Sequence, residues 1–199
     1  MHSYVNDVDT VFERALGGLT LTWSEPNKQL HDQLRVRVNT AQEVCMPVEI
    51  RQLTQDDVAL MNALLATLGE AFDEVPTYTK NPPSSGYLRQ LLGGDSFIAL
   101  VALQGNDVVG GIAAYELRKF EQERSEIYLY DLAVASANRR EGIANALIES
   151  LKEIAAQRGA WVIFVQADTT PEDEPAIALY TKLGTREEVL HFDIAVERA

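Results

Sequence analysis

Residues 125–158 read SEIYLYDLAVASANRREGIANALIESLKEIAAQR, and this stretch decides the fold. Its first ten residues are mostly apolar, as in a buried strand. Apolar residues at helical spacing follow, namely Ile143, Leu147, Leu151 and Ile154. Between the two patterns lies the junction Arg139-Arg140-Glu141-Gly142-Ile143-Ala144. We therefore expect a strand, a short turn and a helix that begins at small residues.

This junction predicts an anion site, most naturally for a phosphate. The first N–H groups of a helix have no intrahelical partners, and the helix dipole adds positive potential there. Gly142 and Ala144 keep side-chain bulk away from these amides, while Arg139 and Arg140 add positive charge. The Gly-Lys-Ser/Thr sequence of a nucleotide-triphosphate loop and the three-glycine dinucleotide fingerprint are both missing. The alternative is an arginine-rich turn that caps an ordinary helix.

Composition narrows the functional classes. The chain has 199 residues, of which 46% are hydrophobic and 24% charged, as in a soluble globular protein. No apolar run approaches the ~20 residues of a membrane span, and no signal-peptide pattern is seen, so we expect a cytoplasmic protein without a membrane partner. One cysteine, Cys45, and three scattered histidines argue against a disulfide and a metal site. The net charge of -13 argues against nucleic acid and favours a cationic partner, although acidic surface also aids solubility.

The chain divides near Met46. Residues 1–45 contain no motif and form an N-terminal extension without an assigned role; their six acidic and four basic residues leave -11 of the net charge on residues 46–199. In the second part, hydrophobic spacing and turn signals predict an α+β domain, with a mixed, mostly antiparallel sheet and helices on both faces. The predicted strands are 48–53, 97–103, 108–117, 125–134, 161–167 and 189–196, and the predicted helices are 58–68, 84–92, 143–158 and 175–183. Residues 69–83 are predicted as a loop, and Gly110-Gly111 as a bulge or a close backbone approach.

Asp131 is an ionisable residue in the apolar strand 125–134. Strict alternation places its side chain on the face of Ile127 and Leu129, opposite Leu132. Because both faces of such a strand are expected to be covered, loss of hydration should raise the pKa of this carboxyl. Asp131 is therefore a candidate general base. The alternative is a structural aspartate that accepts hydrogen bonds from backbone N–H groups or an arginine.

The junction, with the strand before it and the helix after it, resembles the Arg-x-x-Gly-x-Ala acetyl-CoA signature of the GNAT superfamily of N-acetyltransferases. The resemblance implies a GNAT fold and direct acetyl transfer from acetyl-CoA, with neither a covalent nucleophile nor a metal. It also implies the groups that hold acetyl-CoA: the free backbone of Leu132, Ala133 and Val134 for the pantetheine arm and thioester oxygen, and the amides of Arg140, Gly142, Ile143 and Ala144 for the pyrophosphate. Tyr180 is similar to the tyrosine that binds and protonates the departing thiolate; alternatively it is a core tyrosine on a helix stripe.

The acceptor should be a cationic amine, because carboxylates cluster at predicted strand ends and loops. Glu126, Asp131, Asp168 and Asp193 are the candidate substrate-binding residues; together with Glu172 and Asp173 they lie at predicted strand ends or in loops that we expect to rim one cleft. The alternative for most of them individually is a plain surface charge. A carboxylate can also remove the ammonium proton, directly or through water. We expect Asp131 to be this base, with Glu126 as the second candidate.

A narrower resemblance covers residues 48–194. It is to the type I aminoglycoside 3-N-acetyltransferases, and it rests on the segments Phe120 to Gln122, Ser125 to Val134, Val165 to Asp168, Ala178 to Gly184 and His191 to Asp193. It implies acetylation of the 3-amino group of gentamicin-like antibiotics, antibiotic resistance and a homodimer. Two alternatives stay open at this point. One is a GNAT enzyme that acts on a peptide N-terminus, a lysine or a polyamine, and the other is a non-catalytic acyl-CoA-binding module.

Overall fold

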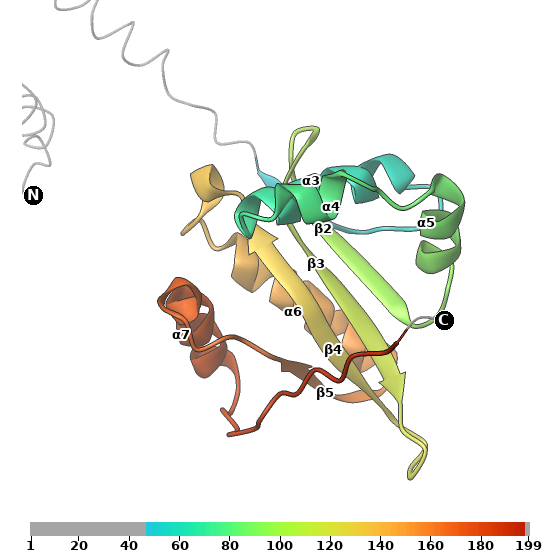
Figure 1. Ribbon diagram of the computed structural model, residues 1–199, viewed down its shortest axis with the longest axis vertical. Coiled ribbons are helices and arrows are strands. Elements are labelled where there is room, and N and C mark those ends of the chain that lie inside the picture. Colours follow the sequence, from blue (N-terminus) through green and yellow to red (C-terminus); the bar gives the residue numbers. More distant parts are fainter. Residues whose placement is uncertain (1–46, 198–199) are drawn as a thin grey trace, which may run out of the picture. The chain divides into compact units, whose positions relative to one another are not determined.

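The computed structural model describes residues 47–197. The predicted extension 1–45, with Cys45, lies outside the described residues. Five strands form one sheet in the order β1-β2-β3-β4-β5 (Figure 1). They are β1 (Val48–Gln52), β2 (Phe97–Gln104), β3 (Asp107–Arg118), β4 (Ser125–Val134) and β5 (Ala160–Val165). Neighbouring strands are antiparallel, except that β4 and β5 are parallel. The predicted mixed, mostly antiparallel sheet is confirmed.

Helices cover both faces of the sheet, as predicted. They are α3 (Val58–Ala71), α4 (Val75–Thr79), α5 (Ser85–Leu92), α6 (Ile143–Gln157) and α7 (Glu174–Leu183), with short 3-10 turns at Ser136–Asn138 and Pro171–Asp173. Leu64 and Leu88 of α3 and α5 belong to one buried cluster, and Leu147 and Leu151 of α6 belong to another. We call the two sides the α3 face and the α6 face. The helix α4 lies inside the predicted loop 69–83, where a proline in its first turn suits a helix start.

The hairpin between β2 and β3 shows both features predicted at the double glycine. The register shifts between Ala102 and Leu103, beside Gly110. A Cβ atom on Gly111 would collide with the carbonyl oxygen of Leu100 and with a methyl group of Leu64. Only glycine therefore allows α3 to pack this closely on the sheet.

A β-bulge in β4 changes which of its side chains share a face, compared with the prediction. Ala113 of β3 lies opposite Asp131, whereas the next residue of β3 lies opposite Leu129, so Tyr130 has no opposite partner. This extra residue reverses the alternation beyond it. Asp131 consequently shares the α3 face with Ala113, and the prediction that placed it with Leu129 was wrong. Leu132 correspondingly packs on the α6 face.

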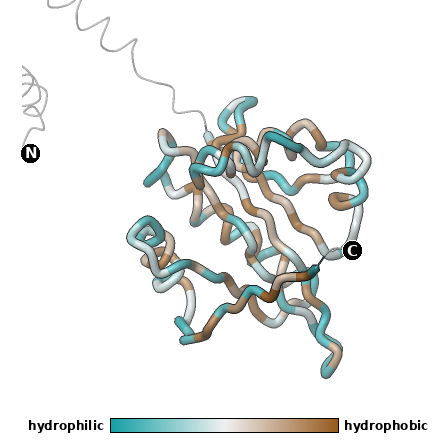
Figure 2. Tube along the Cα trace, in the orientation of Figure 1, coloured by the Kyte–Doolittle hydropathy of each residue, from teal (hydrophilic) through white to brown (hydrophobic). Residues whose placement is uncertain are grey.

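The segment after α7 does not form the strand predicted at 189–196. Residues 184–197 have no helix or strand, and the sheet ends at β5. Apolar side chains alternate along this segment, which is partly brown in Figure 2, but they are exposed to solvent: Leu190, Phe192, Ile194 and Val196. The prediction was wrong because alternation makes a strand only when a neighbouring edge satisfies its backbone groups, and local sequence does not supply that edge.

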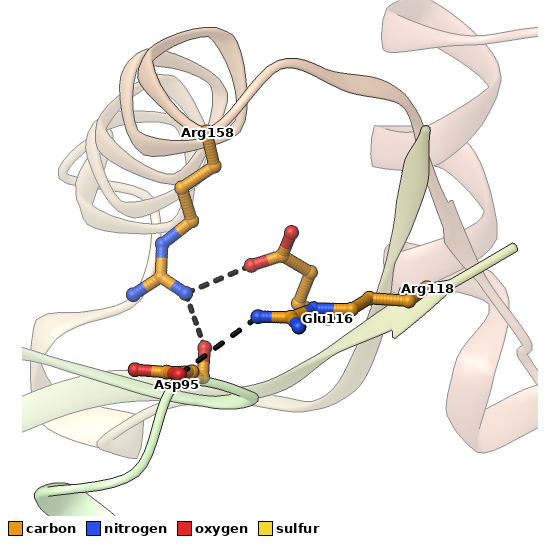
Figure 3. Close-up of polar contacts among 4 residues, drawn as sticks. All are labelled: Asp95, Glu116, Arg118 and Arg158. Carbon is orange, nitrogen blue, oxygen red and sulfur yellow. Dashed lines mark hydrogen bonds and ion pairs between the residues drawn. The ribbon is translucent and has the colours of Figure 1, made fainter. Parts of the chain in front are cut away.

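Arg158, just after α6, joins that helix to β3 and to the turn before β2 (Figure 3). Its guanidinium donates to the backbone oxygen of Asp95 and, at 2.9 Å, to Oε2 of Glu116. Burial alone would raise the pKa of Glu116, but hydrogen bonds from Ser125 and Arg158 outweigh it and lower that pKa. Arg118 reaches the Asp95 carboxylate at 3.8 Å, where both side chains are exposed, so that pair contributes little.

Replacing Arg158 with methionine should lower the free energy of unfolding by about 1–3 kcal/mol, because the mostly buried Glu116 loses a charged partner. Since the folded-state pKa of Glu116 is lowered, its stabilisation is complete above the ordinary glutamate pKa and disappears as the pH falls through the folded value. The stability lost in Arg158→Met should therefore become smaller at acidic pH. Urea unfolding at several pH values measures it. Lys152→Met breaks an exposed pair on the same helix and should change stability by less than about 0.5 kcal/mol; an equal loss in both variants would contradict the role of Arg158.

Candidate functional site

The junction between β4 and α6 has the geometry that the sequence predicts. The helix begins at Ile143, and its first intrahelical hydrogen bond runs from Ala146 N to Gly142 O at 3.0 Å. The amides of residues 142–145 therefore have no partner within the helix. Gly142 has a φ of 83°, and Arg140 also has a positive φ of 69°. These left-handed residues turn the chain sharply into the helix.

The space in front of these amides is open. A Cβ atom built on Gly142 would have no protein atom within 4 Å. Arg139 and Arg140 both lie at the surface beside it. The Arg139 side chain also donates from Nε to the carbonyl oxygen of Val134 at 3.2 Å, which ties the turn to the end of β4. The residues present thus fit a phosphate-containing ligand such as the pyrophosphate of acetyl-CoA.

The strands β4 and β5 part before this junction. Their pairing ends at Leu129 opposite Val165, whereas β4 stays paired with β3 as far as Val134. Among residues 47–197, the last five residues of β4 have no strand partner on the side that faces away from β3. Backbone groups on that side of Leu132, Ala133 and Val134 can therefore bind a ligand.

Asp131 lies on this unpaired part of β4, on the α3 face. Its carboxyl is half-buried, and burial raises its pKa. Tyr78 of α4 donates a hydrogen bond from its hydroxyl to Asp131 Oδ2 at 3.4 Å, and this bond lowers the same pKa in part. Burial first, and then the Asp131 charge and hydrogen bond, raise the pKa of Tyr78 to about 12, so its phenol stays protonated. A carboxyl in these surroundings can accept a proton near neutral pH more readily than an exposed one.

Tyr180 of α7 lies on the other side of this region and packs against the cluster of the α6 face. Burial, followed by the charges of Asp173 and Asp131, raises its pKa to about 12. The phenol therefore keeps its proton at physiological pH.

Of the other predicted acidic residues, Glu126 lies away from Asp131. Glu126 lies five residues back along β4, about 16 Å away at strand spacing, and pairs with Lys119 at 3.5 Å and Arg124 at 3.9 Å. It lies next to a mostly charged cavity of about 450 Å³, lined by residues including Arg124 and Arg158. Asp168 and Asp193 are exposed. The carboxylate of Asp193 pairs with the ring of His191 at 3.1 Å.

Tyr78 is a residue of this site that sequence reasoning missed. It lies in the stretch predicted as a loop, and no motif marks it. Its position depends on α3, since a Cβ atom on Gly69 would lie 3.0 Å from the Cβ atom of Tyr78. The only local signal was Pro76, which suits the first turn of a short helix.

No helix within residues 47–197 has both the length and the apolar character needed to cross a bilayer. No group of three or more His, Cys, Asp or Glu side chains in the same range is arranged to hold a metal ion.

The fold and the junction define an acyl-CoA-dependent N-acetyltransferase class, and the comparison with protein families agrees. Residues 61–185 match the Acetyltransferase (GNAT) family, so the chain belongs to this family. GNAT acetyltransferases use acetyl-CoA as the acyl donor. The sheet and its flanking helices are those of the GNAT fold, as the sequence predicts.

Among solved structures, the chain is similar to the aminoglycoside acetyltransferase HMB0005 from an uncultured soil metagenomic sample. The identity is 67%, the match covers 76% of this chain and 100% of that one, and the TM-score is 0.75. The aminoglycoside acetyltransferase meta-AAC0020, also from soil and solved with sisomicin, is 29% identical over 75% of this chain and 97% of its own, with a TM-score of 0.69. Rattus norvegicus N-acetyltransferase 8F1 is 32% identical over 42% of this chain; the match spans 37% of the rat protein.

Proposed function

We propose that this chain is an aminoglycoside 3-N-acetyltransferase of the type I subfamily, which acetylates the 3-amino group of gentamicin-like antibiotics and confers resistance. Asp131 carries the proposal: it is a half-buried carboxyl with a raised pKa on the strand that leads into the α6 junction. The soil enzymes add support, because one is 67% identical and another, more distant, was solved with sisomicin. A polycationic acceptor also suits the net charge of -13.

The α6 junction and the free part of β4 are the proposed binding site for acetyl-CoA. The amides of Arg140, Gly142, Ile143 and Ala144 would hold its pyrophosphate, with positive charge from Arg139 and Arg140. The backbone of Leu132, Ala133 and Val134 would hold the pantetheine arm. When bound, acetyl-CoA supplies an acetyl group already activated as a thioester.

Within this site, Asp131 acts as the general base and removes a proton from the acceptor ammonium, directly or through one water. Tyr180 keeps a proton at neutral pH and donates it to the leaving sulfur. Glu126, the second candidate for the base, is neutralised by two cations and lies far along β4, so we assign the base to Asp131. Asp168 and Asp193 serve as exposed charges that attract the cationic acceptor.

The direct test is thiol release from acetyl-CoA by the purified full chain, with gentamicin, spermidine or a short peptide as acceptor. Release with gentamicin, and a product acetylated at the 3-amino group, is the expected result. Expression in a susceptible bacterium should also raise the gentamicin concentration that it tolerates. Thiol release with spermidine or the peptide but not with gentamicin would indicate a GNAT enzyme with another substrate. Binding of acetyl-CoA without thiol release on any amine would indicate a non-catalytic binding module.

A homodimer and a cytoplasmic location are proposed on the sequence and its resemblance alone. Light scattering on the purified chain tests the first, where a mass twice the 22.1 kDa of one chain is expected. Cell fractionation tests the second.

Tyr180→Phe should lower kcat by about 10- to 100-fold while the affinity for acetyl-CoA stays nearly unchanged, because only the proton donor is removed. Steady-state kinetics and calorimetric titration of acetyl-CoA measure the two quantities. An unchanged kcat would leave Tyr180 as a packing residue between α7 and the α6 face.

Tyr78→Phe should shift the acid limb of kcat/KM to higher pH. The hydroxyl of Tyr78 lowers the pKa of Asp131, so its removal lets that pKa rise further. A base must be deprotonated, hence activity at mildly acidic pH falls while the plateau at high pH is kept. Tyr87→Phe, an exposed tyrosine on α5, is the control. If the acid limb of kcat/KM lies at the same pH in Tyr78→Phe and wild type, Tyr78 does not influence the pKa of the base.

A further inference from the structure

Aromatic rings form a continuous row across the α3 face of the sheet. The ring of Phe97 lies 5.2 Å from that of Tyr115, which lies 5.8 Å from that of Tyr130. The ring of Tyr130 lies 5.5 Å from that of Tyr128, and Tyr128 stacks on Phe164 at 4.9 Å. We call these five residues the aromatic row. It crosses β2, β3, β4 and β5 in turn, and its separations are those of interacting rings.

Tyr130 is the most exposed ring of this row. Tyr130 is 56% exposed, whereas Phe97, at one end, is 5% exposed. The ring planes of Tyr115 and Tyr128 are inclined at 84° and 76° to that of Tyr130, so two neighbouring rings contact it in edge-to-face pairs. Tyr130 is thus an exposed ring in a fixed orientation rather than an isolated surface side chain.

The bulge in β4 brings this ring next to the candidate base. Tyr130 is the extra residue of the bulge, and Asp131 follows it directly. In a regular strand two consecutive side chains would point to opposite faces. Here Tyr130 contacts rings of the α3 face, and Asp131 lies on the same face opposite Ala113. An aromatic surface and a half-buried carboxyl therefore stand side by side.

We propose that Tyr130 is a specificity-determining residue that holds a protonated amine of the acceptor over its ring while Asp131 receives the proton of a neighbouring amine. This inference rests on the proposed function. The reacting amine must become neutral, but the other amines of an amino sugar remain ammonium ions. The face of a tyrosine ring attracts an ammonium ion without taking its proton, so it positions the acceptor and leaves proton transfer to the carboxylate.

Two substitutions at this position separate cation binding from simple packing. Tyr130→Phe keeps the aromatic face, and its dissociation constant for gentamicin should stay within about twofold of wild type. Tyr130→Leu keeps apolar bulk without the ring, and the same constant should rise by about 5- to 30-fold. Calorimetric titration of gentamicin into the CoA-saturated full chain measures both. In steady-state assays KM should rise in parallel, with kcat and acetyl-CoA affinity kept. Phe120→Ala removes a fully exposed aromatic ring outside the row and should change nothing.

The outcomes separate this inference from the proposed function. If wild type acetylates gentamicin and Tyr130→Leu binds it as tightly as wild type, the role of Tyr130 is overturned and the proposed function stands. If wild type acetylates spermidine but not gentamicin, the proposed substrate fails, and the same two variants titrated with spermidine decide the role of Tyr130. If wild type binds neither amine, both proposals are overturned.

Discussion

Replacement of Gly142 by aspartate should weaken acetyl-CoA binding at least about 100-fold, which corresponds to roughly 3 kcal/mol. Gly142 stands at the start of α6, where open space adjoins amides that have no partner within the helix. A carboxylate in this space would occupy those amides and repel the pyrophosphate. Calorimetric titration of acetyl-CoA, alongside thermal unfolding, measures the effect.

Two control variants isolate the charge from the backbone conformation. Gly159, at the other end of α6, also has a positive φ, 70°, and also has open space at its Cβ position. Gly159→Asp therefore carries a similar conformational cost and should keep acetyl-CoA affinity. Gly142→Asn adds similar volume without charge and should weaken binding less than Gly142→Asp. If wild type and Gly142→Asp bind acetyl-CoA with equal affinity, acetyl-CoA does not bind at this junction.

Asp131→Asn is expected to lower kcat by about 10²- to 10⁴-fold, because asparagine keeps the shape of the side chain but cannot accept the ammonium proton. The dissociation constant for acetyl-CoA should stay unchanged, since the amides at the α6 junction are untouched. Glu126→Gln is the matched control: it neutralises a carboxylate on the same strand that is already paired with Lys119 and Arg124, and its kcat should stay within a few-fold. A larger loss of kcat in Glu126→Gln than in Asp131→Asn would instead identify Glu126 as the base.

The pH dependence of stability gives a second measurement for Asp131. Burial raises its folded-state pKa above the unfolded value, so between the two values the folded state holds more protons and stability falls as the pH rises. The penalty is complete above the folded pKa. Asp131→Asn removes it, so at pH 7 the variant should unfold at the same temperature as wild type or higher, while its activity is lost. A large loss of stability would instead indicate a structural aspartate.

Much of the fold follows from local sequence. Helix α6 starts at Ile143 because Gly142 can adopt the left-handed turn and the apolar stripe begins directly after it. The β2–β3 hairpin is signalled by Gln104-Gly105-Asn106-Asp107, and Gly105 indeed has a positive φ of 64°. In both cases the decisive interactions are within a few residues, and periodicity with one glycine is enough to predict them.

The residues that surround Asp131 depended on tertiary structure. Periodicity placed an ionisable group in a buried strand, but the bulge at Tyr130 arises from pairing with β3, and it decides which face the carboxyl occupies. Tyr78 reaches Asp131 only because α4 packs on α3. The apolar alternation in residues 189–196 forms no strand, because strand formation needs a partner edge. The sequence by itself determined the family and the shape of the β4–α6 junction, for which we propose phosphate binding, because the contacts that shape it are local. Tertiary structure alone decided the surroundings of the proposed base, Asp131, because those contacts join residues up to 53 positions apart.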